Sequence, residues 1–285
     1  MGEPAFAHQI VVVTGAGRGI GRSVALGFAA NGAQVVAADI DLDSAKRTCA
    51  VIESHGASGF AAHADVASAA DMEQLAAWVR AEVGVPDVVV NNAGIAILGS
   101  FLDHTEADWE RIVGVNLLGV ARGCRLFGAQ MVDRGTGGHL VNIASCAAWT
   151  PTSVLPAYSA TKAAVRMLSD CLRAELAGAG VGVTAICPGF TTTGIARAAR
   201  YVGATGEEER ELRESAAAGL ARRRFPPDKV ALAVMRAVIA NKPVVPVNAE
   251  AWVTYALSRL SPALLGRLTR GADKALQTLE RASAG

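Results

Sequence analysis

Short apolar runs alternate along this chain with segments of helical composition, and this alternation limits its possible folds more than any other feature. The first run, residues 9–14, is rich in β-branched side chains and predicts a strand buried on both faces. Further strands are expected at 33–39, 58–64, 86–92, 138–145, 181–187 and 243–247. Helices are expected between them at 22–30, 43–55, 69–83, 106–119, 157–176 and 226–240. Because such alternation produces parallel sheets with right-handed crossovers, we expect an α/β fold, a doubly wound parallel sheet of about seven strands with helices on both faces.

The composition suits one large folded domain. Of 285 residues, 51% are hydrophobic and 19% charged, so the chain can bury a substantial core. A net charge of +1 without a basic tract argues against nucleic acid as a partner. Five scattered cysteines without a Cys-x-x-Cys pair favour reduced thiols in a cytoplasmic protein over disulfides or a metal site. Residues 1–9 lack the basic segment of a secretory signal, and no apolar run reaches the ~18 residues of a membrane span.

A glycine-rich turn follows the first predicted strand. Gly15, Gly19 and Gly21 form the pattern Thr-Gly-x-x-x-Gly-x-Gly, with Arg18 and Ile20 inside it. The lack of side chains lets the backbone approach a pyrophosphate, whose charge the start of the next helix stabilises. A plain tight turn would use the same residues, so the pattern alone is weak. Its position between a strand and a helix predicts a nucleotide-binding corner.

Asp39 ends the second predicted strand, at the distance from the glycine turn where an acid meets the ribose hydroxyls of adenosine. A carboxylate there repels a 2′-phosphate and therefore favours NAD over NADP. Arg18 argues the other way, since a guanidinium could bind that phosphate. We favour NAD because the carboxylate excludes the phosphate wherever the Arg18 side chain points.

Tyr158 and Lys162 lie four residues apart in a predicted helix, which places them on one helical face. A phenol titrates near pH ~10, but a cation held close lowers its pKa. Lys162 could thus make Tyr158 an acid and base for alcohol or carbonyl chemistry. Ser145, at the end of a predicted strand, could hold the substrate oxygen while hydride moves. Taken alone, an ordinary helix-surface pair is the commoner interpretation of this spacing.

Other polar residues are expected at the same edge of the sheet. The carboxyl ends of parallel strands meet there, so Asp65 and Asn91 should join the glycine turn and Asp39 around a ligand crevice. Asn116 falls inside a predicted helix, where asparagine is unfavourable, and an exposed position of no consequence is one interpretation.

Taken together, these motifs resemble the short-chain dehydrogenase/reductase family, in its order and at its usual separations over roughly residues 8–195. They are Thr14-Gly15-x-x-x-Gly19-x-Gly21, Asn91-Asn92-Ala93-Gly94, Asn116, Ser145, Tyr158-x-x-x-Lys162 and Pro188-Gly189. The resemblance implies a Rossmann-type fold, a nicotinamide cofactor and a catalytic set of Asn116, Ser145, Tyr158 and Lys162. It also implies that Asn116 holds a water in a proton relay and that Lys162 binds the nicotinamide ribose.

Cofactor contacts follow from the same resemblance. Asp65 and Val66 would contact adenine, and Thr191 and Thr193 would hold the nicotinamide amide. The full expected set is Gly15, Arg18, Gly19, Ile20, Gly21, Asp39, Asp65, Val66, Asn92, Ala93, Gly94, Tyr158, Lys162, Pro188, Gly189, Thr191 and Thr193. No residue is expected to bind a metal.

The expected organisation is one catalytic domain, 1–247, with a mobile, partly helical substrate lid at about 190–226 and a helical extension at 248–285. The charged runs in the lid, 207–211 and the arginines 222–224, are expected to face solvent, although the three arginines could bind an acidic substrate group. The extension carries an apolar stripe that we expect to pack on its own domain. Coverage of a neighbouring subunit's pocket and peripheral membrane contact are the alternatives.

The resulting hypothesis is an NAD-dependent alcohol dehydrogenase or ketone reductase. Its substrate would be a small-molecule secondary alcohol or ketone, hydrophobic and steroid-like, terpenoid or fatty. An NADP-linked carbonyl reductase is one alternative, and a non-catalytic nicotinamide-nucleotide sensor or scaffold is another. The resemblance also suggests a homotetramer built on the helices at 106–134 and 157–176.

Overall fold

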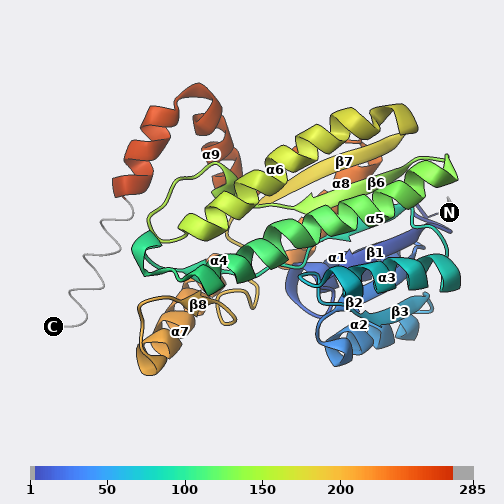
Figure 1. Ribbon diagram of the computed structural model, residues 1–285, viewed down its shortest axis with the longest axis horizontal. Coiled ribbons are helices and arrows are strands. Elements are labelled where there is room, and N and C mark those ends of the chain that lie inside the picture. Colours follow the sequence, from blue (N-terminus) through green and yellow to red (C-terminus); the bar gives the residue numbers. More distant parts are fainter. Residues whose placement is uncertain (1–3, 272–285) are drawn as a thin grey trace.

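A seven-stranded parallel sheet with the order β3-β2-β1-β4-β6-β7-β9 forms the centre of the computed structural model, which describes residues 4–271 (Figure 1). Its strands are β1 Ile10–Thr14, β2 Gln34–Asp39, β3 Gly59–His63, β4 Val88–Asn91, β6 Gly138–Ile143, β7 Val181–Pro188 and β9 Val244–Val247. The helices include α1 Gly19–Ala30, α2 Leu42–Ser54, α3 Ala69–Glu82, α4 Glu106–Val113, α5 Gly119–Arg134, α6 Pro156–Leu176, α7 Gly206–Arg222, α8 Pro227–Ile239 and α9 Ala249–Leu260. The predicted doubly wound α/β sheet is confirmed.

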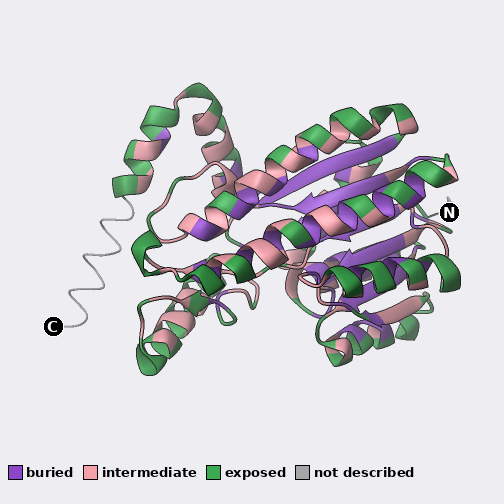
Figure 2. Cartoon of the chain, in the orientation of Figure 1, coloured by how far each residue is buried: buried purple, intermediate pink, exposed green. Residues whose placement is uncertain are grey.

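The β-branched residues of each strand divide between two apolar layers. Val11 and Val13 pack with α1, α2 and α8 on one face of the sheet, whereas Val12 packs with α3, α5 and α6 on the other. All three valines are fully buried. Figure 2 shows the same pattern across the sheet, with buried strands and helices exposed on their outer sides. A strand covered on both faces needs a continuous apolar run, which is why its sequence signal was strong.

Chain order reverses at β1, and this reversal sets the place of a ligand crevice. The chain proceeds from β1 through β2 to β3 on one side, then returns to place β4 on the other side of β1. Loops that follow β1 and β4 therefore separate at the carboxyl edge of the sheet. Open α/β sheets bind ligands at such a point.

The helix predicted at 106–119 is not continuous. α4 ends at Val113, a π-helical turn spans Gly114–Leu118, and α5 begins at Gly119. This turn carries Asn116. π-Helical turns are rare and occur frequently at functional sites, so the interruption at Asn116 is consistent with a functional position.

A small second sheet was not predicted. β5 (Ile97–Leu98) pairs in parallel with β8 (Arg200–Tyr201), and so joins the loop after β4 to the segment expected to form a lid. The junction is close, because a Cβ on Gly99, whose φ is +132°, would lie 2.4 Å from Cγ2 of Val202. Strands of two residues are too short to show any periodicity in the sequence.

The C-terminal extension packs on the domain through only part of its apolar stripe. α9 and the helical residues 262–271 extend away from the sheet in Figure 1. Tyr255 stacks near Trp149 with ring centres 5.1 Å apart, and Leu265 is buried. Trp252, Leu260, Leu264 and Leu268 are exposed. The remainder of the expected extension, 272–285, lies outside the described residues.

By length and hydropathy alone, one helical stretch among the described residues, Glu106–Arg134, could cross a membrane. This is weak support for a membrane span, because buried core helices are often as long and as apolar. Its residues Val120, Phe127 and Met131 are buried against the sheet, as expected for a core helix.

Candidate active site

The glycine turn between β1 and α1 depends on glycine at several positions. Gly15 and Gly19 have φ values of +64° and +55°, a left-handed conformation that favours glycine. A Cβ on Gly21 would lie 2.1 Å from the carbonyl oxygen of Gly15, so a side chain there would displace the turn. Ile20 is partly buried and packs its side chain against the apolar core.

The start of α1 is available to an anion. Arg18 is the N-cap residue, but its side chain forms no capping hydrogen bond, and the first turn holds no acidic residue. Around Gly19, an added Cβ would meet only the side chain of Thr193, at 3.5 Å. Uncapped N–H groups at a helix start suit a diphosphate. The residues present therefore fit the pyrophosphate of a dinucleotide cofactor.

The carboxylate of Asp39 lies against this turn. Its Oδ2 accepts a hydrogen bond from the Gly17 N–H at 2.8 Å, and its Oδ1 accepts one from the Asp41 N–H at 3.0 Å. These bonds hold Asp39 between the end of β2 and the glycine turn, as the sequence predicted. Arg18 is exposed and pairs with no acidic residue in the described part of the chain.

Asn92 joins the end of β4 to the end of β1. Its Nδ2 donates to the carbonyl oxygens of Thr14 and Gly15, at 2.9 and 3.1 Å. In return, the Thr14 hydroxyl accepts hydrogen bonds from the N–H groups of Asn92 and Ala93, at 3.0 and 3.2 Å. The Asn92 amide thus supports the glycine turn, while Gly94 is exposed and lies close to Asn116 and Lys162.

Asn91 does not face the crevice, so that expectation was wrong. Its side chain shares the face of β4 on which Val89 packs, and its Nδ2 donates to Oδ1 of Asn142 at 2.8 Å. A Cβ on Gly123 would lie 2.0 Å from the Asn91 Oδ1, so α5 approaches closely only because glycine is there. The alternation of side chains along a strand sends Asn91 into the core.

Asp65 and Val66 follow β3, on the adenine side of the expected crevice. The Asp65 Oδ1 accepts a hydrogen bond from the Ala67 N–H at 2.9 Å. Val66 is buried, and a Cβ on Gly119 would lie 2.8 Å from its Cγ2. Its carbonyl oxygen accepts from Nη1 of Arg122 at 3.1 Å. Contacts with α5 therefore hold this segment in place.

Ser145, Tyr158 and Lys162 are brought together at the carboxyl edge of the sheet. Lys162 is buried, its Nζ donates to the Ile143 carbonyl oxygen at 2.8 Å, and the same atom lies 5.7 Å from the centre of the Tyr158 ring. Ser145 follows β6, and its Oγ accepts from the Ala147 N–H at 3.2 Å. The helix that carries Tyr158 begins at Pro156, a favoured residue at a first helical position.

Burial dominates the acid–base properties of this group. It raises the pKa of Tyr158 to about 12, although the Ser145 hydroxyl acts to lower it. It also lowers the pKa of Lys162 to about 8. The expected lowering of the tyrosine pKa by lysine is therefore wrong for the free protein. Desolvation disfavours the phenolate, and the Lys162 ammonium is directed to the Ile143 carbonyl oxygen.

Asn116 is fully buried and is not the exposed polar position that one interpretation allowed. Its Oδ1 accepts from the Ile95 N–H at 2.9 Å, and its Nδ2 donates to the Ile95 carbonyl oxygen at 3.0 Å. A second donation reaches the Thr161 hydroxyl at 3.3 Å. The Asn116 amide therefore donates both of its hydrogen bonds within the protein. These bonds hold the loop after β4 beside α6, the helix that carries Tyr158.

The N-cap and first turn of α9 hold the start of the expected lid, and the sequence did not reveal this. The Phe190 N–H donates to Oε1 of Glu250 at 3.1 Å, and Nδ2 of Asn248 donates to the Phe190 carbonyl oxygen at 3.4 Å. A Cβ on Gly189 would lie 2.4 Å from the Asn248 Oδ1. The only local signal was the helix cap at Asn248, whose longer-range contacts depend on the fold.

Three other residues predicted to contact the cofactor lie in or beside this segment: Pro188, Thr191 and Thr193. Pro188 ends β7 and is buried. Thr191 is also buried, and its hydroxyl donates to the Gly189 carbonyl oxygen at 3.3 Å. Thr193 lies over Gly19, as described above, and so brings the lid to the glycine turn. Among residues 4–271, no group of His, Cys, Asp and Glu side chains could hold a metal ion.

The family model described as short chain dehydrogenase matches residues 9–201. The chain therefore belongs to the short-chain dehydrogenase/reductase family. It is 47% identical over 267 residues to the probable oxidoreductase EphD of Mycobacterium tuberculosis, a match that covers 93% of this chain and 45% of that protein. The chain thus spans about half the length of the first curated relatives that it matches. A short-chain dehydrogenase/reductase of Armillaria gallica is 35% identical over 215 residues, 74% of this chain and 82% of that protein.

Solved structures give the same assignment. A short-chain dehydrogenase/reductase from Burkholderia phymatum, crystallised in complex with NAD, superposes with a TM-score of 0.80 at 29% identity and 97% coverage of both chains. A short-chain dehydrogenase from Streptomyces avermitilis superposes with a TM-score of 0.77 at 26% identity, over 97% of this chain and 99% of that one.

Proposed function

We propose that this protein is an NAD-dependent oxidoreductase that interconverts a secondary alcohol and its ketone. The observation that carries the proposal is the placement of Ser145, Tyr158 and Lys162 at the sheet edge that also holds the uncapped α1 and Asp39. The NAD complex of the Burkholderia phymatum relative supports the choice of cofactor.

Each catalytic side chain has a defined part in the proposed chemistry. The glycine turn, Asp39 and Thr193 would hold the cofactor, which supplies the hydride acceptor or donor when bound. In ketone reduction, Tyr158 Oη gives its proton to the substrate oxygen, and in alcohol oxidation it takes the hydroxyl proton. The Ser145 hydroxyl holds that oxygen by a hydrogen bond. Lys162 places a positive charge near the phenol, and Asn116 positions the adjoining loop through Ile95.

The substrate that we propose is hydrophobic, such as a steroid-like, terpenoid or fatty alcohol. Exposed apolar side chains on the lid and α9, among them Phe190 and Trp252, support this choice. Trp149, four residues after Ser145, donates from Nε1 to the Thr254 hydroxyl at 2.9 Å, so α9 adjoins the catalytic segment. We further propose a homotetramer, on the family resemblance, and a cytoplasmic location, on the five scattered cysteines.

A second candidate is an NADP-linked carbonyl reductase. The exposed Arg18 favours it, because its guanidinium forms no ion pair in the described part of the chain and could bind a 2′-phosphate. The two candidates share every catalytic residue and differ only in whether Arg18 or Asp39 decides the choice of cofactor.

Removal of the tyrosine hydroxyl tests the mechanism. We expect Tyr158→Phe to lower kcat on secondary alcohols or ketones by about 10²- to 10⁴-fold, because the general acid and base is lost. Cofactor affinity, measured by the fluorescence of bound NADH, should remain nearly unchanged. Tyr255→Phe, which removes a phenol hydroxyl on α9, is the matched control and should retain turnover. Wild-type kcat in Tyr158→Phe would contradict the proposal.

A further inference from the structure

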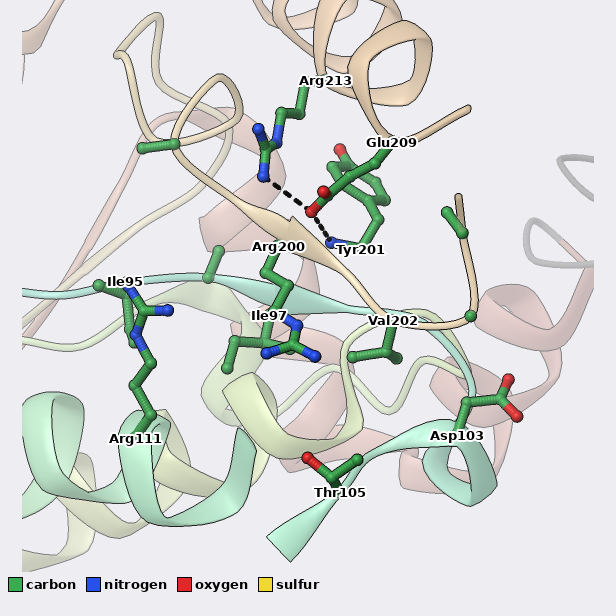
Figure 3. Close-up of a pocket in the computed structure, with 14 residues that line it drawn as sticks. Ile95, Ile97, Asp103, Thr105, Arg111, Arg200, Tyr201, Val202, Glu209 and Arg213 are labelled. Atoms are coloured by element: carbon green, nitrogen blue, oxygen red, sulfur yellow. Dashed lines mark hydrogen bonds and ion pairs between the residues drawn. The ribbon is translucent and has the colours of Figure 1, made fainter. Parts of the chain in front are cut away.

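A pocket of about 520 Å³ lies between α4, the β5–β8 pair and α7 (Figure 3). This volume falls in the range of about 300–1,000 Å³ that is common for small-molecule sites. Neither Ser145 nor Tyr158 lines the pocket, so it is separate from the catalytic side chains. It instead lies where the expected lid meets α4.

Three arginines line the pocket, and two of them have acidic partners. Nη1 of Arg200 lies 2.9 Å from Oδ1 of Asp108, a carboxylate that is fully buried. Nη2 of Arg213 lies 2.7 Å from Oε1 of Glu209, which also accepts from the Tyr201 N–H at 3.0 Å. Each of these pairs is locally neutral, and Figure 3 shows the second pair at the α7 side of the pocket.

The third arginine, Arg111, supplies positive charge that no partner neutralises. It lies on α4, is exposed, and forms no ion pair within the described part of the chain. The remaining lining carboxylate, Asp103, lies at the opposite side of the pocket from Arg111 (Figure 3). The pocket therefore has a cationic end at Arg111, with the partly exposed Arg200 guanidinium between that end and Asp103.

Apolar side chains connect this pocket with the catalytic tyrosine. Ile95, Ile97 and Val202 line the pocket. The same three residues pack in one cluster with Tyr158. Because the Asn116 amide holds both backbone groups of Ile95, this shared wall is fixed from the catalytic side. A ligand in the pocket would thus contact residues of the apolar cluster that also contains Tyr158.

We propose that this pocket binds an organic anion, a carboxylate or phosphate group on an apolar body, with Arg111 as its principal contact and Arg200 beside it. The planar guanidinium can donate two parallel hydrogen bonds to such an oxyanion, and the opposite charges strengthen them. A neutral ligand lacks this charge and would bind more weakly. Ile95 and Val202, which are partly exposed, would contact the apolar body. The anion is either the distal end of the substrate, in which case this inference deepens the proposed function, or a separate organic anion.

Hexanoate tests the pocket without any need for turnover. Calorimetric titration of the full chain saturated with NADH, at pH 7.5 and constant ionic strength, compares wild type with Arg111→Gln. We expect the dissociation constant of hexanoate to rise at least about tenfold in the variant, which corresponds to about 1.4 kcal/mol. Arg197→Gln, an exposed arginine on the same segment as Arg200 but outside the pocket, should bind hexanoate as wild type does. Neutral hexanamide should bind wild type more weakly than hexanoate.

Equal affinity of wild type and Arg111→Gln for hexanoate, or no binding to wild type, would overturn the proposal. Steady-state kinetics then separate the two sources of the anion. If it is the substrate's own end, hexanoate competes with the alcohol, and Arg111→Gln raises the KM of a hydroxy acid more than that of a neutral secondary alcohol. If it is a separate ligand, hexanoate changes the rate without competing. If the proposed function is wrong, no alcohol will support hydride transfer. The hexanoate affinities of wild type and Arg111→Gln do not depend on turnover and would still test the pocket.

Discussion

At the scale of single residues, the free protein holds the proposed acid–base pair, Tyr158 and Lys162, in the protonation states suited to reduction. A Tyr158 pKa of about 12 leaves only about one phenolate in 10⁵ molecules at pH 7. A phenol that stays protonated can give a proton to a ketone at once, whereas alcohol oxidation must wait for phenolate. Lys162, with a pKa of about 8, is charged at neutral pH and loses that charge just above it.

These two pKa values predict opposite pH profiles for the two directions. With saturating cofactor, kcat/KM for oxidation should rise by up to about tenfold per pH unit between pH 7 and 8, where Lys162 is still charged, because the phenolate fraction rises. For reduction, kcat/KM should be flat up to about pH 8 and then fall as the Lys162 ammonium deprotonates. Initial rates in both directions provide the measurement. An oxidation rate independent of pH would exclude Tyr158 as the base.

At the scale of elements, one buried carboxylate fastens the expected lid to the body. Asp108 closes the capping box of α4 with Thr105 and also pairs with Arg200 on β8. Burial acts to raise the pKa of Asp108, but the hydrogen bonds from Thr105 and the Arg200 guanidinium outweigh it and hold the pKa below its usual 3.8. Its contribution to stability is therefore present above pH 3.8 and is lost as the pH falls through the lowered value.

Asp108→Asn should lower the free energy of unfolding by about 1–3 kcal/mol, because a half-exposed arginine loses a buried partner and the cap loses one of its acceptors. Urea denaturation at pH 7 measures this change. The difference from wild type should begin to shrink below pH 3.8, where the carboxylate of the unfolded chain takes up a proton, and should be smallest once the pH falls below the lowered pKa of the native carboxylate. Glu207→Gln, which breaks the exposed pair with Arg210 on α7, should have little effect. A pH-independent difference would show that charge is not the cause.

The sequence predicted elements well where one local pattern determines them. Strands β1 and β4 are continuous apolar runs, and the glycine turn is a local arrangement of φ values, so both were recognisable. The π-helical turn at Asn116 depends on a contact with Ile95, which lies 21 residues away in the chain. The β5–β8 pair and the pocket at Arg111 likewise join distant segments. No local composition identifies such contacts.

At the scale of the whole molecule, the strand order explains why residues from distant segments meet. The glycine turn after β1, Asn92 after β4 and Ser145 after β6 all reach the same edge, because the sheet is parallel and its order reverses at β1. α9 adds contacts to Phe190 from outside that core, so the extension is coupled to the start of the expected lid. One face of the molecule thereby combines the proposed cofactor, catalytic and substrate contacts.

Titration with NADH and then NADPH, followed through the fluorescence of the bound dihydronicotinamide, tests the proposed cofactor most directly. The carboxylate of Asp39, fixed against the glycine turn, predicts that NADH binds at least about tenfold more tightly, about 1.4 kcal/mol. Asp39→Ser should bring the two dissociation constants closer together, because NADH would bind more weakly and the 2′-phosphate of NADPH would no longer be repelled. Tighter binding of NADPH by wild type would show that Arg18 governs the choice, and binding of neither would contradict a nicotinamide-dependent oxidoreductase altogether.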